Sequence, residues 1–417
     1  MIVLPKSLRI SHAIGAVVMM SVVVAPRTAV AQGVGSGPLT TTLADTEPTS
    51  GVLSFARMKL APGIVIREIG WDDNVFDEAD RPKEDYVASV MPDVSVFSRL
   101  RFVQVSAYAG ADLNYYKKYV NERSAGYSLK GRIDLLLSRV SPFIGVGSVE
   151  QRTRPNGEID VRADRDEKEI TGGVAFDLSQ YASVFAAVNV YHLEFRDAFE
   201  ESVNLAEALS RDSPTYSVGV RSALTPLLTM TVNGSYGEDN FKKAPLRNTQ
   251  TYAAQMALRF APEAVVTGAL NVGYRDFKPV DPLVDRFRGI TGSVAMSYSF
   301  LEVARVGVTG TRAIEFSFNQ AEAYYIDNTI TGYYTHRLFG DVDAQARAGR
   351  SLFDYGHRQN TPPHRDTLDT VGASIGYNLP NRTRISVNYE NARRRSPVFP
   401  ERNYQRRRAF LSWAFAF

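Results

Sequence analysis

The 417-residue chain lacks cysteine, has only two tryptophans and carries little net charge, because 48 Lys and Arg oppose 45 Asp and Glu. Without cysteine, disulfides, thiolate catalysis and Cys-ligated metals are excluded. After residue 25, no segment approaches the roughly twenty apolar residues that a membrane-spanning helix needs. Tyr and Phe are abundant, with 21 and 22 residues. This composition suits a β-barrel, because only every second residue of its strands faces lipid.

The N-terminus has the layout of a secretory signal peptide. Lys6 and Arg9 precede a mainly apolar run at 14–25, and Ala29-Val30-Ala31 forms the small-x-small pattern of a cleavage site. We therefore predict that residues 1–31 are a cleaved signal peptide. It contains three basic residues and no acid, so the remaining chain has no net charge. Charge therefore gives no indication of nucleic-acid binding.

After a segment at 32–60 that begins rich in Gly, Ser, Thr and Pro, the chain alternates in polarity with a period of two. In 228–236, one face carries Leu228, Met230, Val232, Gly234 and Tyr236, while the other is polar. This period is typical of strands whose two faces meet different surroundings. Only 205–209 predicts a short loop helix. We predict a flexible periplasmic leader at 32–60 and an all-β barrel at 61–417.

The connections between the strand segments alternate in length. Tight turns are indicated near 98–99, 138–142, 179–180, 225–226, 261–262, 300–301, 338–341 and 379–381. Longer polar stretches lie near 73–83, 116–124, 153–166, 196–210, 239–246, 277–285, 316–322, 356–365 and 396–403. Eight turns and nine loops predict a transmembrane, antiparallel up-and-down β-barrel of about eighteen strands, with sixteen as an alternative. Short periplasmic turns and long outer loops are typical of outer-membrane barrels, which would put both termini in the periplasm.

The chain ends on an alternating aromatic segment. Its apolar face consists of Leu411, Trp413, Phe415 and Phe417. An unfinished soluble strand of this kind would expose an apolar edge, whereas a barrel strand would place the aromatics at a membrane interface. The segment also resembles the C-terminal signature of Gram-negative outer-membrane proteins, which implies recognition by the barrel assembly machinery. The alternative is a buried last strand in a soluble sandwich.

The first long connection contains a motif that is followed by Asp85-Tyr86 and Met91-Pro92-Asp93. The motif residues are Trp71, Asp72, Asp73, Asn74, Val75 and Phe76. In these residues the chain resembles the putative β-barrel porin-2 family. The resemblance implies an outer-membrane barrel and a role linked to capsule or exopolysaccharide export. It implies no catalytic residue.

Two clusters of charge lie at opposite ends of the chain. The first loop carries Asp72, Asp73, Asp77, Glu78, Asp80, Glu84 and Asp85. It predicts either a cation site, since Ca²⁺ prefers several carboxylate oxygens, or a solvated loop whose acids satisfy turn backbone. The last hairpin carries Arg393, Arg394, Arg395, Arg402, Arg406, Arg407 and Arg408. Because the last strand of a closed barrel pairs with the first, we expect the two clusters to meet at the seam or rim. Lipopolysaccharide phosphate binding outside, or a selectivity role inside, are the alternatives.

Local motifs for catalysis are absent. Only His192, His336, His357 and His364 follow the signal peptide, and neither a Gly-x-Ser-x-Gly nor a His-Glu-x-x-His motif occurs. We therefore expect that the protein is not an enzyme and binds no cofactor or metal. An outer-membrane hydrolase is a distant alternative.

The leading hypothesis is a porin-like channel for hydrophilic solutes in a Gram-negative outer membrane, linked to surface polysaccharide export. The second is a structural or surface-interaction barrel with a closed lumen. Expected partners are outer-membrane lipid and lipopolysaccharide, the assembly machinery and polysaccharide, and not nucleic acid.

Overall fold

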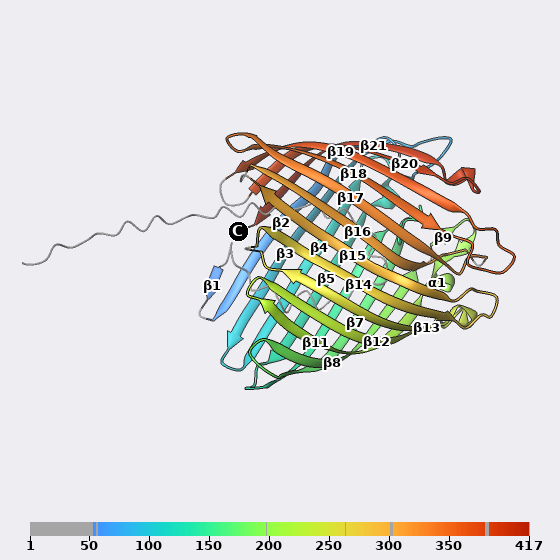
Figure 1. Ribbon diagram of the computed structural model, residues 1–417. Coiled ribbons are helices and arrows are strands. Elements are labelled where there is room, and N and C mark those ends of the chain that lie inside the picture. Colours follow the sequence, from blue (N-terminus) through green and yellow to red (C-terminus); the bar gives the residue numbers. More distant parts are fainter. Residues whose placement is uncertain are drawn as a thin grey trace, which may run out of the picture.

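The computed structural model describes residues 53–55, 57–196, 198–262, 264–300, 303–319, 321–379 and 383–416. Alternating polarity produces one dominant element, a closed antiparallel β-barrel of 18 strands (Figure 1). The strands are β2 (Met58–Asp72), β3 (Asp85–Leu100), β4 (Val103–Tyr116), β5 (Ser124–Leu135), β6 (Val140–Thr153), β7 (Ala163–Asp177), β8 (Ala182–Arg196), β11 (Arg211–Thr225), β12 (Leu228–Asp239), β13 (Thr249–Phe260), β14 (Val266–Pro279), β15 (Phe287–Phe300), β16 (Ala304–Phe316), β17 (Tyr324–Phe339), β18 (Val342–Asp354), β19 (Arg365–Leu379), β20 (Thr383–Arg395) and β21 (Tyr404–Ala416).

The barrel closes where the last strand pairs with the first. β21 runs antiparallel to β2 from Gly63 opposite Ala416 to Asp72 opposite Arg408. Every other barrel strand pairs with its neighbours along the chain, so the sheet has no free edge. A short extra strand, β1 (Leu53–Phe55), forms a hairpin with the start of β2. The predicted eighteen strands are confirmed, and the alternative of sixteen is wrong.

Short turns connect the strands at one end of the barrel and long loops at the other, as Figure 1 shows. The loop between β8 and β11 contains β9 (Phe199–Glu200), β10 (Val203–Asn204) and the helix α1 (Leu205–Ala208). The side chain of Asn204 accepts a hydrogen bond from the Ala206 amide and so caps this predicted helix. Single 3₁₀ turns lie in three other loops, at Val120–Glu122, Pro245–Arg247 and Pro400–Arg402. No helix in the described part of the chain is long and apolar enough to cross a membrane.

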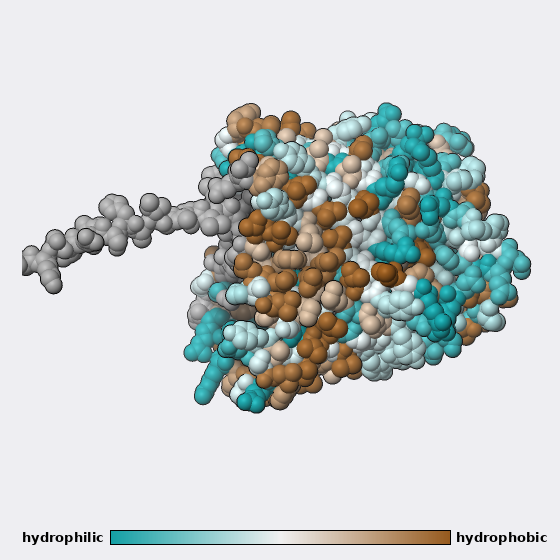
Figure 2. Space-filling model, viewed as in Figure 1, coloured by the Kyte–Doolittle hydropathy of each residue, from teal (hydrophilic) through white to brown (hydrophobic). Residues whose placement is uncertain are grey.

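The outer wall carries an apolar belt. Side chains such as Val218, Ile290 and Val387 are 61–65% exposed although they lie within strands. Figure 2 shows the belt in brown over the half of the barrel nearer the turns, whereas the loop half is mostly teal. A barrel in water would leave this surface uncovered, so the belt is the surface that lipid covers.

The apolar core lies at the loop end of the barrel. We call it the mouth cluster. Its buried side chains include Ile159, Leu193, Phe195, Leu205, Leu209, Phe241, Phe277, Phe287, Phe316, Phe318 and Tyr324. At the ends of β16 and β17, residues 313–318 and 324–326 are buried on both faces, so this hairpin end packs into the cluster. Loops that the sequence predicted to be polar and solvated therefore fold together over the mouth of the barrel.

The predicted signal peptide at 1–31 and most of the leader predicted at 32–60 lie outside the described residues. Within that leader, residues 53–55 and 58–60 are strand. The barrel therefore begins slightly earlier than predicted.

Candidate functional site

The inward face of the strands is polar and ion-paired. On β12 the inward residues include Thr229, Thr231, Asn233 and Ser235. Charged side chains pair along the wall as Arg67–Asp112 at 2.7 Å, Arg132–Asp134 at 2.8 Å, Arg165–Glu167 at 2.8 Å and Arg384–Asp343 at 2.6 Å. The carboxylates accept hydrogen bonds from these guanidinium groups, so the arginines need no apolar surroundings. A lumen with this lining is suited to water and hydrophilic solutes.

A bulge in β2 directs two consecutive charges into the lumen. The register of β2 shifts between Ile66 and Ile69 against β21, and between Ile66 and Glu68 against β3. A bulge of this kind re-aims a side chain that strict alternation would send to the other face. Arg67 consequently donates to Ser89 at 2.7 Å as well as to Asp112. Glu68 pairs with Arg408 of β21 at 3.0 Å.

The seam between β2 and β21 is held by a charge network. The Arg406 guanidinium binds the nearly buried Asp72 carboxylate with two nitrogens, and its Nη1 lies 3.4 Å from Asp77 Oδ1. Arg408 pairs with Glu68 and also with Glu390 of β20. Charge-assisted, multidentate contacts of this kind are the strong class of hydrogen bond. The seam is therefore both a backbone ladder and an ionic contact.

The motif loop binds the last strand through its polar residues. Asp73 Oδ1 accepts from the Arg407 amide at 2.6 Å, and Asn74 Nδ2 donates to the Gln405 carbonyl at 3.1 Å. Asn74 also closes its own turn through Glu78, at 2.8 and 2.9 Å. Asp73 is thus engaged with backbone, and Asp72 and Asp77 with Arg406. Among the described residues, no group of three or more acidic or histidine side chains is arranged to hold a metal ion.

The apolar motif residues Val75 and Phe76 and the neighbouring Trp71 each have a different environment. Val75 is fully buried, and its carbonyl accepts from two arginines of the β6–β7 loop, Arg154 at 3.0 Å and Arg162 at 2.7 Å. Phe76 packs edge-on against Tyr119, with ring centroids 4.8 Å apart. Trp71 donates to Glu84 at 3.1 Å. The motif therefore positions the first loop between the seam and the mouth.

Strand alternation divides the basic cluster of the last hairpin into three groups. Arg394, Arg406 and Arg408 face inward, whereas Arg393, Arg395 and Arg407 lie on the outer face. Arg402 sits in the loop, where it pairs with Glu201 at 2.8 Å and lies over the Phe399 ring. Of these arginines, the structure thus brings Arg406, Arg407 and Arg408 to the acidic first loop and β2. Arg407 makes this contact through its backbone amide.

The β6–β7 loop, residues 154–162, crosses the mouth of the barrel. Arg394 of β20 donates to the Glu158 carbonyl at 3.2 Å, although β5, β4, β3, β2 and β21 separate β6 from β20 around the wall. On another side of the mouth, Glu158 Oε1 accepts from Ser317 Oγ at 2.8 Å and Oε2 from the Phe318 amide at 3.2 Å. This loop therefore bridges distant parts of the wall and narrows the passage.

Two acids of this crossing loop have perturbed pKa values. Glu158 has no exposed surface, and burial raises its pKa to about 7 against the opposing effect of Arg402, whose Nη1 is 3.8 Å away. Burial likewise raises the pKa of Asp160 to about 7, while Arg394 at 3.5 Å opposes the rise. Both groups consequently change charge near neutral pH, inside a contact that closes the mouth.

The two histidines of the β18–β19 loop are held apart by separate partners. His357 stacks on Tyr324, with centroids 4.7 Å apart, and its ring nitrogen lies 3.1 Å from the Asp354 carbonyl. His364 is 3.3 Å from Glu322 Oε1 and stacks on Tyr355. Their environment is aromatic packing within the mouth.

The terminal aromatic face is present on β21 as far as the described residues extend. Leu411 is 49% exposed, and the rings of Trp413 and Phe415 lie 5.9 Å apart. Their cross-strand partners on β2 are Ile69, Ile66 and Ile64. Phe417 lies outside the described residues. Whether the segment is an assembly signal stays a prediction.

Several inward aromatic rings lie flat against glycines of the next strand. A Cβ at Gly307 would come within 2.1 Å of the Tyr333 ring, and one at Gly219 within 2.8 Å of the Phe185 ring. The missing side chain lets each ring lie on the wall instead of projecting across the lumen. The Phe143 ring lies in the same way beside Gly173, but the Arg132 guanidinium covers it at 3.9 Å.

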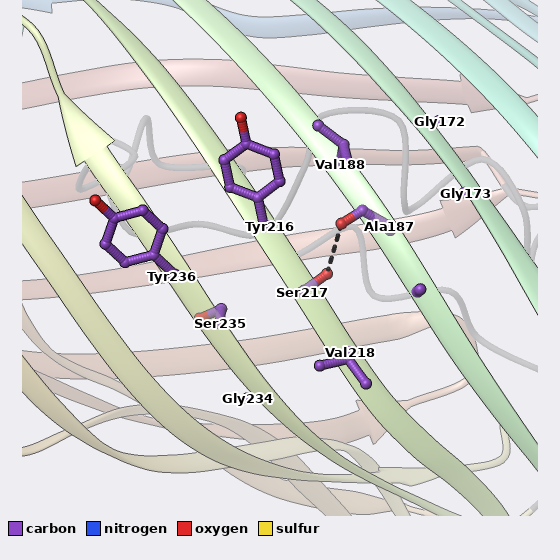
Figure 3. Close-up of a pocket in the computed structure, with 11 residues that line it drawn as sticks. Gly172, Gly173, Ala187, Val188, Tyr216, Ser217, Val218, Gly234, Ser235 and Tyr236 are labelled. Carbon is purple, nitrogen blue, oxygen red and sulfur yellow. Dashed lines mark hydrogen bonds between the residues drawn. The ribbon is translucent and has the colours of Figure 1, made fainter.

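The outer wall has a shallow hollow of about 510 Å³ over β7, β8, β11 and β12 (Figure 3). Small residues such as Gly172, Ala186 and Gly234 form its floor, and Tyr216 and Tyr236 stand at its side with nearly parallel rings 6.5 Å apart. The hollow belongs to the lipid-facing belt, outside the lumen.

Comparison with known families agrees with this architecture. Residues 60–417 match the model of the family described as "Putative beta-barrel porin 2". The chain belongs to this family. Family membership makes it a porin-like outer-membrane β-barrel channel rather than an enzyme. The motif loop had predicted this family. No curated protein matches the chain.

Solved structures of similar shape have low sequence identity to the chain. OpdK of Pseudomonas aeruginosa is 9% identical, with a TM-score of 0.48 over 86% of this chain and 99% of that one. OccAB3 of Acinetobacter baumannii is 11% identical, with a TM-score of 0.49 over 87% and 100%. A BenF-like porin of Pseudomonas fluorescens is 10% identical, with a TM-score of 0.49 over 86% and 99%.

The crossing loop was missed by the sequence analysis. The sequence did contain an indication of it. Ile159 and Val161 are apolar residues within a connection expected to be solvated, and Phe318 is an apolar residue within another such connection. Such residues in a long loop indicate that the loop packs on something. The pairing of Glu158 with Ser317 carries no such signal, because 159 residues separate the two in the chain.

Proposed function

We propose that this channel passes saccharide chains, in connection with capsule or exopolysaccharide export. The observation that supports the proposal is the set of rings lying flat on the lumen wall. Tyr333 and Phe185 turn a ring face toward the lumen because Gly307 and Gly219 leave room behind them. Sugar rings present apolar C–H faces that stack on aromatic rings, while their hydroxyls bond polar groups such as those of the surrounding wall. The family resemblance of the motif loop supports the same substrate class.

The test is current block by oligosaccharide in planar bilayers. We expect the folded wild-type channel to be blocked by fragments of the producing cell's own surface polysaccharide, and both Tyr333→Ala and Phe185→Ala to weaken the block several-fold. Tyr334→Ala is the matched control, because Tyr334 is adjacent in sequence but 43% exposed on the outer wall. If oligosaccharide blocked the current of every variant as strongly as that of the wild type, the aromatic rings would not contact the saccharide. In cells, a deletion mutant with normal surface polysaccharide would remove the export link.

The packed mouth favours a second candidate, a surface-interaction barrel whose lumen stays closed. Glu158, Ile159 and Phe318 are buried at 1% exposure or less, which is unusual for the loops of an open pore. Single-channel recording separates the two functions. Conductance steps from folded protein support the channel, whereas a silent membrane with verified insertion supports the closed barrel.

A further inference from the structure

Three arginines on the outer face of the last hairpin have no partner for their side chains. Arg393 and Arg395 of β20 and Arg407 of β21 make no side-chain hydrogen bond or ion pair with any described residue. Arg393 is opposite Gln405, and Arg407 is opposite Asn391, so the two arginines are diagonal neighbours on one face. Diagonal neighbours in a ladder lie about 7–8 Å apart. Three positive charges are therefore gathered within one small area.

Several other outward arginines of the barrel pair with acids of the chain. Arg196 pairs with Glu150 at 3.0 Å and Asp166 at 2.9 Å. Arg286 and Arg288 share Asp276. The acid opposite Arg393, Asp369, is engaged by Arg350 at 2.6 Å. Among the residues that the structure describes, no acid pairs with the hairpin cluster to neutralise it. Like charges that lie together at low free-energy cost need such a counter-charge.

A cavity of about 490 Å³ adjoins this cluster. It is lined by Ala79 of the first loop and by Arg393, Arg394, Arg395, Ser396, Pro397, Asn403, Tyr404 and Gln405 of the hairpin. Its loop wall is held in place, because Asn403 Oδ1 accepts from the Ser396 amide at 2.6 Å and Ser396 Oγ from the Phe399 amide at 3.3 Å. Arg394 is drawn inward by Asp366 at 2.9 Å. The cavity therefore has a hydrogen-bonded loop wall beside the cationic side chains of Arg393 and Arg395.

The cluster begins where the apolar belt ends. On the outer face of β20, Val387 and Tyr389 are 61% and 47% exposed, and Asn391, Arg393 and Arg395 follow toward the loops. Figure 2 shows the corresponding change from brown to teal along the wall. An aromatic followed by cations marks the level where hydrocarbon gives way to headgroups. With the long loops outside, this is the headgroup level of the outer leaflet.

We propose that Arg393, Arg395 and Arg407 bind the phosphorylated sugar headgroup of an outer-leaflet glycolipid. Guanidinium groups bind phosphate oxygens in a bidentate manner and remain charged at any pH of the cell surface. A lipid is favoured over a soluble anion because the three side chains face away from the lumen, directly above the apolar belt that acyl chains cover. The site is separate from the lumen and does not depend on what the channel passes.

The test uses the folded full-length barrel in detergent and three probes: bis-phosphorylated lipid A, the same lipid after removal of both phosphates, and inorganic phosphate. We expect saturable binding of the bis-phosphorylated lipid, at least tenfold weaker in R393Q/R395Q/R407Q and in 0.5 M salt. The matched control is R196Q/R286Q/R288Q, which removes three outward arginines that have internal partners and should leave binding unchanged. Heat-modifiable mobility verifies folding of each variant, and Arg395→Gln alone serves if the triple variant does not fold.

Three results would overturn the proposal. The first is equal affinity in the wild type and R393Q/R395Q/R407Q. The second is equal affinity for the lipid with and without phosphates, which would indicate acyl-chain binding only. The third is binding of inorganic phosphate as tight as that of the lipid, which would indicate a soluble-anion site.

Discussion

Glu158 is a buried carboxyl whose ionisation is linked to the packing of one loop. Its pKa is about 7 in the packed loop and would return to about the ordinary 4.5 in a loop detached into water. Between these two pH values the packed state binds more protons than the detached state. The stabilising contribution is therefore present below pH 4.5 and is lost as the pH rises through 7, and it amounts to a few kcal/mol, on the order of 1.4 kcal/mol for each pH unit between the two values.

We expect the crossing loop to detach more often at pH 8 than at pH 5, so that the time-averaged conductance rises with pH. Glu158→Gln keeps an acceptor oxygen for the Phe318 amide, and its NH2 group can donate to Ser317 Oγ. Because this side chain cannot ionise, the substitution should weaken the pH dependence. Asp160 titrates in the same range, so the double variant E158Q/D160N should remove most of the remainder. Conductance recorded in bilayers from pH 5 to 8 measures the effect.

The exposed Glu401 provides the control for this experiment, because Glu401→Gln removes a carboxylate from a neighbouring loop at the surface. Its conductance should follow the wild-type pH profile. An unchanged profile in E158Q/D160N would show that neither carboxyl is linked to the opening of the mouth.

At the scale of elements, the seam between β2 and β21 depends on the face of each arginine. Arg406 points to the lumen side and neutralises Asp72, whose side chain is only 4% exposed, whereas the neighbouring Arg407 points outward. Reversing Arg393, Arg394 and Arg395 would not test this contact, because the structure engages other arginines there.

We expect Arg406→Gln to destabilise the barrel by on the order of 3 kcal/mol, because it leaves the nearly buried Asp72 carboxylate without its partner. Arg407→Gln should leave stability within about 0.5 kcal/mol, since that side chain has no ion pair among the described residues. Urea midpoints, followed by heat-modifiable mobility, compare the two. Equal midpoints would contradict a stabilising role for the Arg406–Asp72 contact.

The strand pattern predicted most elements, but it did not predict their irregularities. Period-two alternation and turn spacing were sufficient for eighteen strands, and the segment 205–209 predicted the helix α1. The bulge at Arg67–Glu68 was not foreseeable, because two consecutive charges in a strand interrupt alternation without showing that both turn inward. Pairing with both β3 and β21 decides that, and both are tertiary contacts.

At the scale of the whole molecule, the loops decide how open the barrel is. Eighteen strands enclose a lumen wide enough for water, yet residues 154–162 cross its mouth and the mouth cluster packs beside them. The resistance of the channel should therefore lie in this loop layer and not in the wall.

We expect deletion of residues 156–160 to raise single-channel conductance several-fold, because it removes Glu158 and its contacts with Ser317, Phe318 and Arg394. Deletion of 80–82, three exposed residues of the first loop, is the length-related control and should leave conductance unchanged. Equal conductance in both deletions, with folding verified, would place the constriction elsewhere in the lumen.

The amino-acid sequence alone determined the class, the strand number, the alternation of turns and loops, and the apolar belt. These follow from local periodicity and from the free-energy cost of exposing backbone or charge to lipid, which act within a few residues. The tertiary structure alone decided that Arg406 reaches Asp72 and that Glu158 is buried between Ser317 and Arg402. It also decided that Arg393, Arg395 and Arg407 face outward, without an ion pair to any residue in the described ranges. Such contacts join segments more than a hundred residues apart, and only closure of the barrel brings them within hydrogen-bonding distance.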